Sequence, residues 1–322
     1  MAAVLIGFAW FYPSPDFLYI SNRASPVASK VKVEGAKPRV GDKGAIYYVD
    51  VSVRQATWAE RILPFLRPEG SSLVPHDQVV PSGSSFEDQR AAGLQQMALS
   101  ERVAAAVALK QAGFKVGAIP RGALVEDVAT DAPAAAKLIS GDIIVAALGH
   151  VIRTPDQLRR AFEGVRPGDS VVLRVLRSGT ESNVTVRTVE SHVEPGRALI
   201  GIRVSQAADI TLPLKVDINL GDVGGPSAGL PFALDVLQEL GTNVDHGRRV
   251  VATGEIALDG SVGPIGGVKQ KTFGARKAGA DVFLVPAGDN AAEARRYAGN
   301  LRIIPVKSFQ QALSALRTLP PK

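Results

Sequence analysis

The sequence of 322 residues contains no cysteine. This absence excludes disulfide bonds and thiolate nucleophiles, and it is compatible with any cellular compartment. Histidine is also scarce, and the four in the chain are His76, His150, His192 and His246. No two of them have the spacing of metal ligands and no H-E-x-x-H motif occurs, so the sequence does not support a catalytic metal.

Two other features are missing. The chain has no G-x-x-x-x-G-K-[ST] motif, the loop with which P-loop ATPases hold phosphate. Its net charge of +6 is spread along the chain without basic clusters that alternate with aromatic residues. Nucleic-acid binding is therefore not indicated. We expect no cofactor, no metal and no nucleic-acid partner.

Long hydrophobic runs are nearly absent, and the one exception is N-terminal. Residues 2–12, AAVLIGFAWFY, are uninterrupted apolar residues that end at Pro13. A membrane-spanning helix needs roughly 20 such residues, and a signal-peptide core needs roughly 7–15. This run has several possible interpretations: a complete anchor, a signal-peptide core, a truncated helix, or a buried strand or helix. Because soluble domains rarely begin with such a run, we favour a membrane anchor within residues 1–20.

The whole chain has 46% hydrophobic residues, enough for real cores, and its length favours two folded units. A glycine-flanked serine, Ser227, stands out in GDVGGPSAGL. Apolar residues recur at helical spacing over 230–240, and residues 214–220 alternate like a strand. Ser227 is thus expected at a helix N-terminus. There its own amide and those of Gly224 and Gly225 are candidates for stabilising an oxyanion.

One lysine has the periodicity of a buried residue. Val268, Lys271, Ala275 and Ala278 follow one another at steps of three, four and three, so they form one helical stripe. Lys269 lies on another face, which we expect to be solvated. Burial and the nearby helix start should depress the pKa of Lys271, as a general base requires. The alternative is an ordinary lysine whose amine reaches water from an alanine-rich stripe.

Residues 225–229 also satisfy G-x-S-x-G, the nucleophile elbow of the α/β-hydrolases. That fold requires an acid and then a histidine later in the chain. Only His246 follows the serine, and it lies in a Gly/Asn/Asp turn directly after the serine helix. The hydrolase triad is therefore a poor fit.

The motifs GGPSAG, TGEI and PIGGVKQK, in this order, resemble the proteolytic domain of the Lon family. The resemblance implies that Ser227 is the nucleophile, that Lys271 is its base and that Thr253 lies beside this catalytic dyad. The Lon pattern often has an acidic residue three positions before the serine, where this chain has Gly224. The ATPase module of full-length Lon is missing, so the resemblance implies ATP-independent proteolysis.

Residues 117–190 have their own organisation. A strand is expected from Gly122, "GD" at 141–142 precedes a second, and Thr154-Pro155 starts a capped helix. "PGD" at 167–169 leads into two further strands. This order resembles a bacterial PDZ domain, although a generic small α/β insert would have similar motifs. The resemblance implies strand-like binding of a peptide, with Arg121, Gly122 and Ala123 in the loop that captures its terminal carboxylate and helix 155–164 as the other wall.

Together these segments resemble the PDZ-containing Lon-like proteases of bacteria. The expected fold class is α+β: a Lon-type proteolytic domain, formed by residues 28–115 and 195–322, with the PDZ domain inserted at 117–190. The resemblance implies a serine endopeptidase tethered to the cell membrane by one N-terminal anchor, with its catalytic part extracytoplasmic. The PDZ domain would recruit or gate protein or peptide substrates, with their C-termini as one point of recognition. Whether the chain forms a homo-oligomer is left open by the sequence. The alternative is a non-catalytic PDZ scaffold with a degenerate protease domain.

Overall fold

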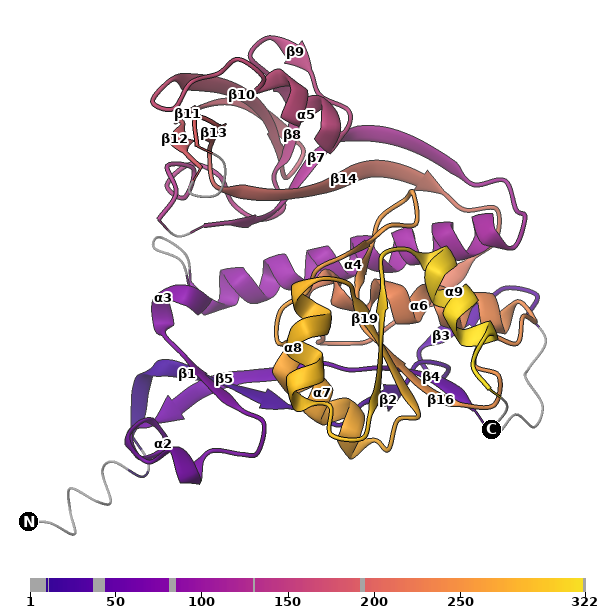
Figure 1. Ribbon diagram of the computed structural model, residues 1–322. Helices are drawn as coiled ribbons and strands as arrows, with labels where there is room; N and C mark the ends of the chain where they lie inside the picture. Colours follow the sequence, from indigo (N-terminus) through magenta and orange to yellow (C-terminus); the bar gives the residue numbers. More distant parts are fainter. Residues whose placement is uncertain are drawn as a thin grey trace, which may run out of the picture. The chain divides into compact units, whose positions relative to one another are not determined.

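The computed structural model describes residues 10, 12–36, 44–80, 85–129, 131–191 and 195–320. It contains two compact units. The first takes the chain up to residue 79, residues 97–115 and residues 212–322, and the second takes residues 80–96 and 116–211. Both units mix helices and strands, so the α+β class is confirmed for the two folded parts of the chain (Figure 1).

The first unit is built on a five-stranded sheet. Its order is β2 (Ser25–Pro26), β4 (Ala45–Tyr48), β16 (Arg249–Ala252), β19 (Val282–Pro286) and β20 (Arg302–Val306). The last four strands are parallel, and β2 is an antiparallel edge. All five residues of β19 are buried, because a parallel strand covered on both faces needs a continuous apolar run.

Helices cover this sheet. They are the residues of α4 (Phe86–Gln111) from Met97 onward, α6 (Gly229–Glu239), α7 (Val268–Lys277), α8 (Asp289–Tyr297) and α9 (Phe309–Arg317). One apolar cluster joins Val251 and Phe283 of the sheet to Val268 of α7 and Ala294 of α8. The helices that the apolar spacing predicts after residues 227 and 268 are therefore confirmed, as α6 and α7.

A three-stranded antiparallel sheet in the same unit contains β1 (Pro13–Ser21), flanked by β5 (Val51–Thr57) and β6 (Ser72–Val74). Short helices α2 (Trp58–Ile62), η1 (Pro64–Leu66) and α3 (His76–Val79) accompany it. Two-stranded pairs complete the unit: β3 (Val31–Val33) with β15 (Val216–Ile218), and β17 (Glu255–Ile256) with β18 (Val262–Gly263).

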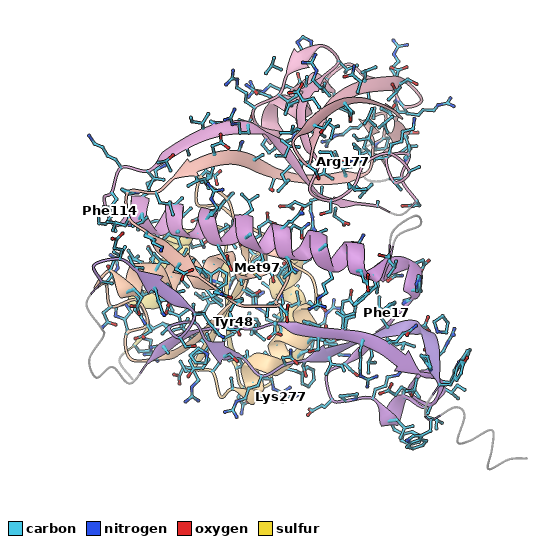
Figure 2. All side chains as sticks on the ribbon, turned by 180° about the vertical axis from the view of Figure 1, so that it is seen from behind. Phe17, Tyr48, Met97, Phe114, Arg177 and Lys277 are labelled. Carbon is cyan, nitrogen blue, oxygen red and sulfur yellow. The ribbon has the colours of Figure 1, made fainter. Side chains whose placement is uncertain are left out.

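The expected anchor at 1–20 needs a correction at its C-terminal end. Residues 13–20 form most of strand β1, in which Phe17 and Leu18 are buried (Figure 2). Residues 1–9 and 11, which hold most of the apolar run, lie outside the described residues. Within the described part of the chain, none of the helices combines the length and the hydropathy that a membrane span requires.

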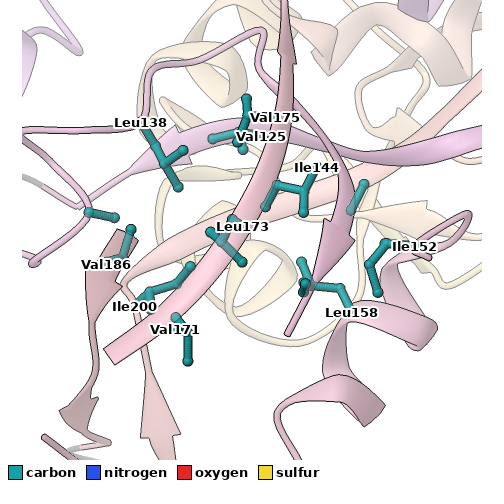
Figure 3. Packing of buried hydrophobic residues seen from close by; sticks show 13 residues of the cluster. Val125, Leu138, Ile144, Ile152, Leu158, Val171, Leu173, Val175, Val186 and Ile200 are labelled. Atoms are coloured by element: carbon teal, nitrogen blue, oxygen red, sulfur yellow. The ribbon is translucent and has the colours of Figure 1, made fainter. Parts of the chain in front are cut away.

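The second unit has one large antiparallel sheet, the short helix α5 and the part of α4 that precedes Met97. The sheet order is β11 (Thr180–Arg187), β10 (Ser170–Arg177), β8 (Ile143–Ala147), β7 (Gly117–Val128) and β14 (Ile202–Thr211), with β9 (His150–Val151) beside β8. Helix α5 (Pro155–Ala161) and the pair β12 (Val189–Glu190) and β13 (Ala198–Leu199) complete it. Val125, Ile144, Leu173 and Leu158 meet in its core (Figure 3).

The second unit contains an ion pair between the buried Asp142 and the partly exposed Arg177. The carboxylate of Asp142, which has no exposed surface, accepts hydrogen bonds from Nε and Nη2 of Arg177, both at 2.7 Å. The amide of Ile139 donates to Asp142 Oδ2 at 3.0 Å. The hydrogen bonds to Asp142 raise the pKa of Arg177. A buried carboxylate requires such partners, so the "GD" at 141–142 has a structural role.

The second unit extends further than the sequence predicts. Strand β14 pairs with β7 from Ile202 opposite Val128 to Thr211 opposite Gly117. Residues 195–211, which we expected in the proteolytic domain, therefore belong with the PDZ-like sheet, and residues 80–96 also join this unit. The pairing connects strands far apart in the chain, and no local sequence signal records such a register.

Candidate active site

Ser227 lies in η2 (Pro226–Ala228), a single 3₁₀ turn that leads directly into α6. Gly225 precedes this turn with φ of 92°, a left-handed value that a side chain disfavours. No atom lies within 4 Å of the position of a Cβ there, so Gly225 is needed for its backbone conformation and not for space. Ser227 is therefore held just before a helix N-terminus, as its sequence setting predicts.

Two hydrogen bonds from neighbouring groups fix the backbone of this turn. The hydroxyl of Ser100, on α4, donates to the carbonyl oxygen of Pro226 at 3.0 Å. The amide of Gly254 donates to the carbonyl oxygen of Ser227 at 2.8 Å. A Cβ on Gly229 would come within 2.8 Å of Ser100 Oγ, so only glycine allows this close packing. The position of Ser227 is thus set from both sides of the turn.

Lys271 is in the first turns of α7, which begins after Gly267 in a left-handed conformation. Its side chain is only 4% exposed, and Val268, Ala275 and Ala278 of the same stripe are buried as well. A long cationic side chain is rarely buried to this extent without a specific environment. In this structure Lys271 does not reach solvent, which removes the reading of an ordinary surface lysine.

The structure brings Lys271, Ser227 and Thr253 together. Lys271 Nζ hydrogen-bonds Ser227 Oγ at 2.8 Å and lies 3.4 Å from Thr253 Oγ1. The Thr253 hydroxyl donates to the carbonyl oxygen of Ser227 at 3.1 Å, which leaves its own oxygen available to the lysine. A nucleophile and its base within hydrogen-bond distance, with a third group beside them, is the geometry of nucleophilic catalysis.

Burial lowers the pKa of Lys271 from 10.5 to about 7. The charge of Asp50, between β4 and β5, opposes this effect and raises the pKa. Asn22 Nδ2 donates to Asp50 Oδ2 at 2.6 Å, which holds this carboxylate in place. Lys271 is therefore partly neutral near pH 7. Sequence reasoning missed Asp50, because no motif links it to a lysine more than 200 positions later.

The expectation of a solvated face at Lys269 is wrong. Lys269 is half-buried, and its Nζ donates to the carbonyl oxygen of Ser71 at 2.8 Å. The same ammonium lies 5.7 Å from the ring centre of Tyr297. The segment around β6 packs over this face of α7. The spacing of apolar residues within a helix cannot predict this contact, because it comes from a distant part of the chain.

An acidic residue with a raised pKa, Glu101, lies on α4 next to Ser100. Burial, and then the charge of Asp217, raise the pKa of Glu101 to about 7. Asp217 also lines a polar cavity of about 350 Å³ together with Lys30, Lys32, Asn219 and others. Two carboxyl groups that repel one another cannot both ionise easily. Sequence reasoning did not assign Glu101 a role. The one sequence feature that points to Glu101 is its position directly after Ser100 in the same helix.

The expected carboxylate loop of the PDZ domain needs correction. Arg121, Gly122 and Ala123 lie in the middle of β7. Gly122 and Ala123 pair with β14 on one side, Ala123 pairs with β8 on the other, and Arg121 falls at a register shift between β7 and β14. Arg121 forms an ion pair with Asp209 of β14. A Cβ on Gly122 would come within 2.5 Å of the carbonyl oxygen of Ile144, so this glycine serves strand packing. Amides already used in a sheet cannot capture a terminal carboxylate.

A groove lies elsewhere in the second unit, between α5 and residues 196–204. It has a volume of about 790 Å³, and its walls include Leu158 and Phe162 on one side and Ile202 and Val204 on the other. Helix α5 (Pro155–Ala161) is one wall of this groove, but the opposite wall is residues 196–204 and not the loop at 120–123 that we expected. In the sheet β14 is an end strand, and an end strand can accept a further strand.

Comparisons with known proteins agree with both halves of this description. Residues 213–318 match the family model of the Lon protease (S16) C-terminal proteolytic domain, and residues 83–188 match that of the PDZ domain. The chain is 31% identical over 140 residues to a Lon protease of Chloroflexus aggregans and 34% identical over 114 residues to Lon protease 2 of Bacillus subtilis. These matches cover 42% and 34% of the chain but only 17% and 20% of the length of the two relatives.

A solved structure, the PDZ domain of the SdrC-like protein from Listeria monocytogenes, is 22% identical to the chain with a TM-score of 0.25. The match covers 26% of the chain and 87% of the solved domain. The chain thus combines a Lon-type proteolytic domain with a PDZ domain. This is the domain composition of a PDZ-containing Lon-like protease, the family that the sequence resembles.

Proposed function

We propose that this chain is an ATP-independent serine endopeptidase in which Ser227 is the nucleophile and Lys271 its general base. The distance of 2.8 Å between Lys271 Nζ and Ser227 Oγ, inside a buried setting, carries the proposal. The lowered pKa of Lys271 supports it, because a base must be neutral before it can accept a proton.

The reaction begins at the neutral amine of Lys271, which takes the proton of the Ser227 hydroxyl. Oγ attacks the carbonyl carbon of the scissile peptide bond, and the carbonyl electron pair moves to oxygen. When the tetrahedral intermediate collapses, the C–N bond breaks and the Lys271 ammonium gives its proton to the leaving amine. The product is an ester of Ser227.

Water then completes the cycle. Lys271, neutral again, takes a proton from a water molecule as the water oxygen attacks the ester carbonyl carbon. When this tetrahedral intermediate collapses, the C–Oγ bond breaks, the Lys271 ammonium returns the proton to Ser227 Oγ, and the product leaves as a carboxylic acid. Thr253 stays in place through its bond to the Ser227 carbonyl and keeps Nζ directed at Oγ. The amides of Gly224, Gly225 and Ser227 are the proposed donors to the oxyanion.

The PDZ domain would recruit or gate protein substrates. An extended peptide could add to the outer edge of β14 and place its side chains against Leu158 and Phe162 of the groove. None of the residues of the proposed dyad belongs to this unit, so substrate capture and chemistry would be separate tasks. The apolar run at residues 2–12 supports a location at the cell membrane with the catalytic part extracytoplasmic.

The test is cleavage of an unfolded model protein by the purified chain, with and without ATP and Mg²⁺. We expect cleavage that does not change with ATP and that Ser227→Ala and Lys271→Ala abolish. Undiminished cleavage by Ser227→Ala would remove the dyad. No cleavage by the parent chain would favour the alternative, a peptide-binding scaffold with a degenerate proteolytic domain.

A further inference from the structure

The first unit exposes a group of large apolar side chains on α2 and η1. Phe65 is 78% exposed, Ile62 is 64% exposed, and Leu63 between them is exposed as well. Trp10 and Tyr12, at the start of β1, are also about half exposed. Single exposed apolar residues are common on soluble proteins, whereas a group of aromatic and aliphatic ones marks an interaction surface.

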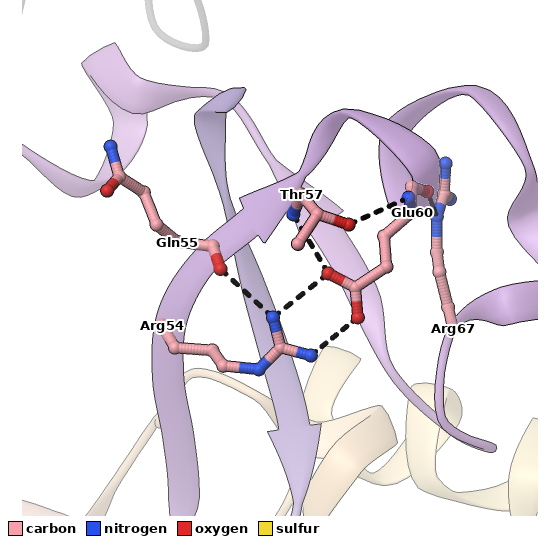
Figure 4. Close-up of polar contacts among 5 residues, drawn as sticks. All are labelled: Arg54, Gln55, Thr57, Glu60 and Arg67. Atoms are coloured by element: carbon pink, nitrogen blue, oxygen red, sulfur yellow. Dashed lines mark hydrogen bonds and ion pairs between the residues drawn. The ribbon is translucent and has the colours of Figure 1, made fainter. Parts of the chain in front are cut away.

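A polar network holds this apolar segment in one conformation (Figure 4). Thr57 and Glu60 form a reciprocal capping box at the start of α2. Both oxygens of Glu60 also accept hydrogen bonds from Arg54, at 2.9 and 2.5 Å. Arg67, beyond η1, donates to the carbonyl oxygens of Glu60 and Arg61 at 2.6 and 2.9 Å. Phe65 is therefore presented to solvent by an ordered frame.

The charges of this frame are arranged with the cations outward. In the pair of Arg54 and Glu60 the side chains are 45% and 12% exposed, and Arg61 is likewise more exposed than its partner Asp16. The Arg61 guanidinium also lies 5.0 Å from the ring centre of Trp58. Solvent on this side therefore meets guanidinium groups and apolar rings, while the carboxylates lie beneath them.

The N-terminal apolar sequence joins the same place. The amide of Trp58 donates to the carbonyl oxygen of Tyr12 at 3.1 Å, and Pro13 lies opposite Thr57 in the sheet. In the sequence, the apolar residues 2–9 come shortly before Tyr12.

We propose that the surface formed by Tyr12, Trp58, Ile62, Leu63 and Phe65 docks into the headgroup region of an anionic lipid bilayer. Trp and Tyr favour this depth, because their rings are apolar while their polar atoms stay hydrated. Arginine stems can lie along the apolar boundary while their guanidinium groups bind lipid phosphates. A second copy of this chain fits less well, since it would bring the outward arginines face to face.

This docking surface would add a second membrane contact to any anchor that the apolar run at residues 2–12 provides. It would hold the first unit against the bilayer in a defined orientation, which a single flexible tether cannot do. The inference does not depend on the proposed peptidase activity, and its test uses no activity measurement.

Trp10 and Trp58 are the two tryptophans of the sequence, which makes fluorescence a direct probe. In the full chain with Trp10→Phe, Trp58 is the remaining tryptophan. We expect its emission to shift to the blue, and to be quenched by brominated acyl chains, on vesicles of phosphatidylcholine with phosphatidylglycerol. Vesicles of phosphatidylcholine alone should give a weaker response, because they lack net negative charge.

Substitution of both exposed apolar anchors should weaken this response. Ile62→Ser with Phe65→Ser should lower vesicle partitioning of the Trp10→Phe chain by at least about tenfold. Ile119→Ser is the matched control, since Ile119 is 57% exposed on β7 outside this surface, and it should have no effect. Circular dichroism of each variant checks that the fold is kept.

Three outcomes would overturn the proposal. One is a Trp58 emission that stays unchanged while the protein sediments with vesicles, because the N-terminal run would then bind alone. Another is equal partitioning of the double-serine variant and its parent. The third is a blue shift without lipid that grows with protein concentration, which would identify a second copy as the occupant.

Discussion

The hydroxyl of Ser100 donates to the carbonyl oxygen of Pro226, the residue that precedes the proposed nucleophile. This bond connects α4 to the η2 turn, and the tight fit between Ser100 and Gly229 reinforces it. Because the Ser100 hydroxyl bonds to the backbone of the turn, we regard Ser100 as a positioning residue.

We expect Ser100→Ala to lower kcat by roughly 5- to 20-fold with little change in KM, because a turn that is less fixed misplaces Ser227. The fold should be kept. The measurement is steady-state cleavage of a short fluorogenic peptide. Ser14→Ala is the control, since Ser14 is a similarly buried serine on β1. Equal effects of both variants on kcat would contradict a specific role of Ser100.

The pH dependence of the reaction should follow the amine of Lys271. Since its pKa is lowered to about 7, activity should rise as the pH passes through that value. Lys271→Ala should lose roughly 10²- to 10⁴-fold, and Lys271→Arg should fail as well, because a guanidinium stays protonated.

Lys269→Ala is the matched control on the same helix, and it should keep most of the activity. Its ammonium contacts Ser71 and not the dyad, so the loss should be mainly one of local stability. An inactive Lys269→Ala together with an active Lys271→Ala would show that the base has been misassigned.

Burial of Lys271 should also make stability depend on pH. The folded pKa of about 7 lies below the ordinary value of 10.5, so the unfolded chain binds more protons between these values. The free energy of unfolding should therefore rise with pH across this window, by at most about 1.4 kcal/mol per pH unit from this one group.

Lys271→Met, which keeps the length of the side chain but cannot ionise, should lack this contribution. At pH 7 we expect it to be more stable than the parent chain, with a difference that shrinks toward pH 10. Denaturant unfolding at several pH values would measure this. A difference that does not change with pH would mean that Lys271 is not desolvated in the folded state.

Peptide capture should depend on the groove beside α5. We expect Phe162→Ala to weaken binding of a fluorescent peptide with an apolar C-terminus by about tenfold, through lost apolar contact. Arg121→Ala should bind as the parent does, because Arg121 lies in a paired strand. Fluorescence anisotropy would measure both, and the reverse order of effects would restore the loop at 121–123 as the carboxylate site.

Much of the proposed catalytic site follows from local sequence. Glycines before Ser227 and apolar spacing after it predict a turn and a helix, and steps of three and four residues place Lys271 on the inner side of α7. These signals are local, because helical periodicity depends on residues only a few positions apart. The PDZ resemblance likewise depended on short turns and caps, such as Thr154 before α5.

Other features required the tertiary structure. Asp50 acts on Lys271, Ser71 binds Lys269, and Ser100 binds Pro226, each across a long stretch of chain. No local pattern can record such pairs, since each depends on how separate elements pack.

The sequence by itself indicated the proposed chemistry: a serine at the start of a helix, a lysine on an apolar stripe, and two domain types with recognisable motifs. Only the tertiary structure decided the lowered pKa of Lys271, the 2.8 Å distance between Lys271 Nζ and Ser227 Oγ, and the assignment of β14 to the PDZ-like sheet. The physical reason is that desolvation, side-chain distance and strand register arise from residues that are remote in the chain and meet only on folding.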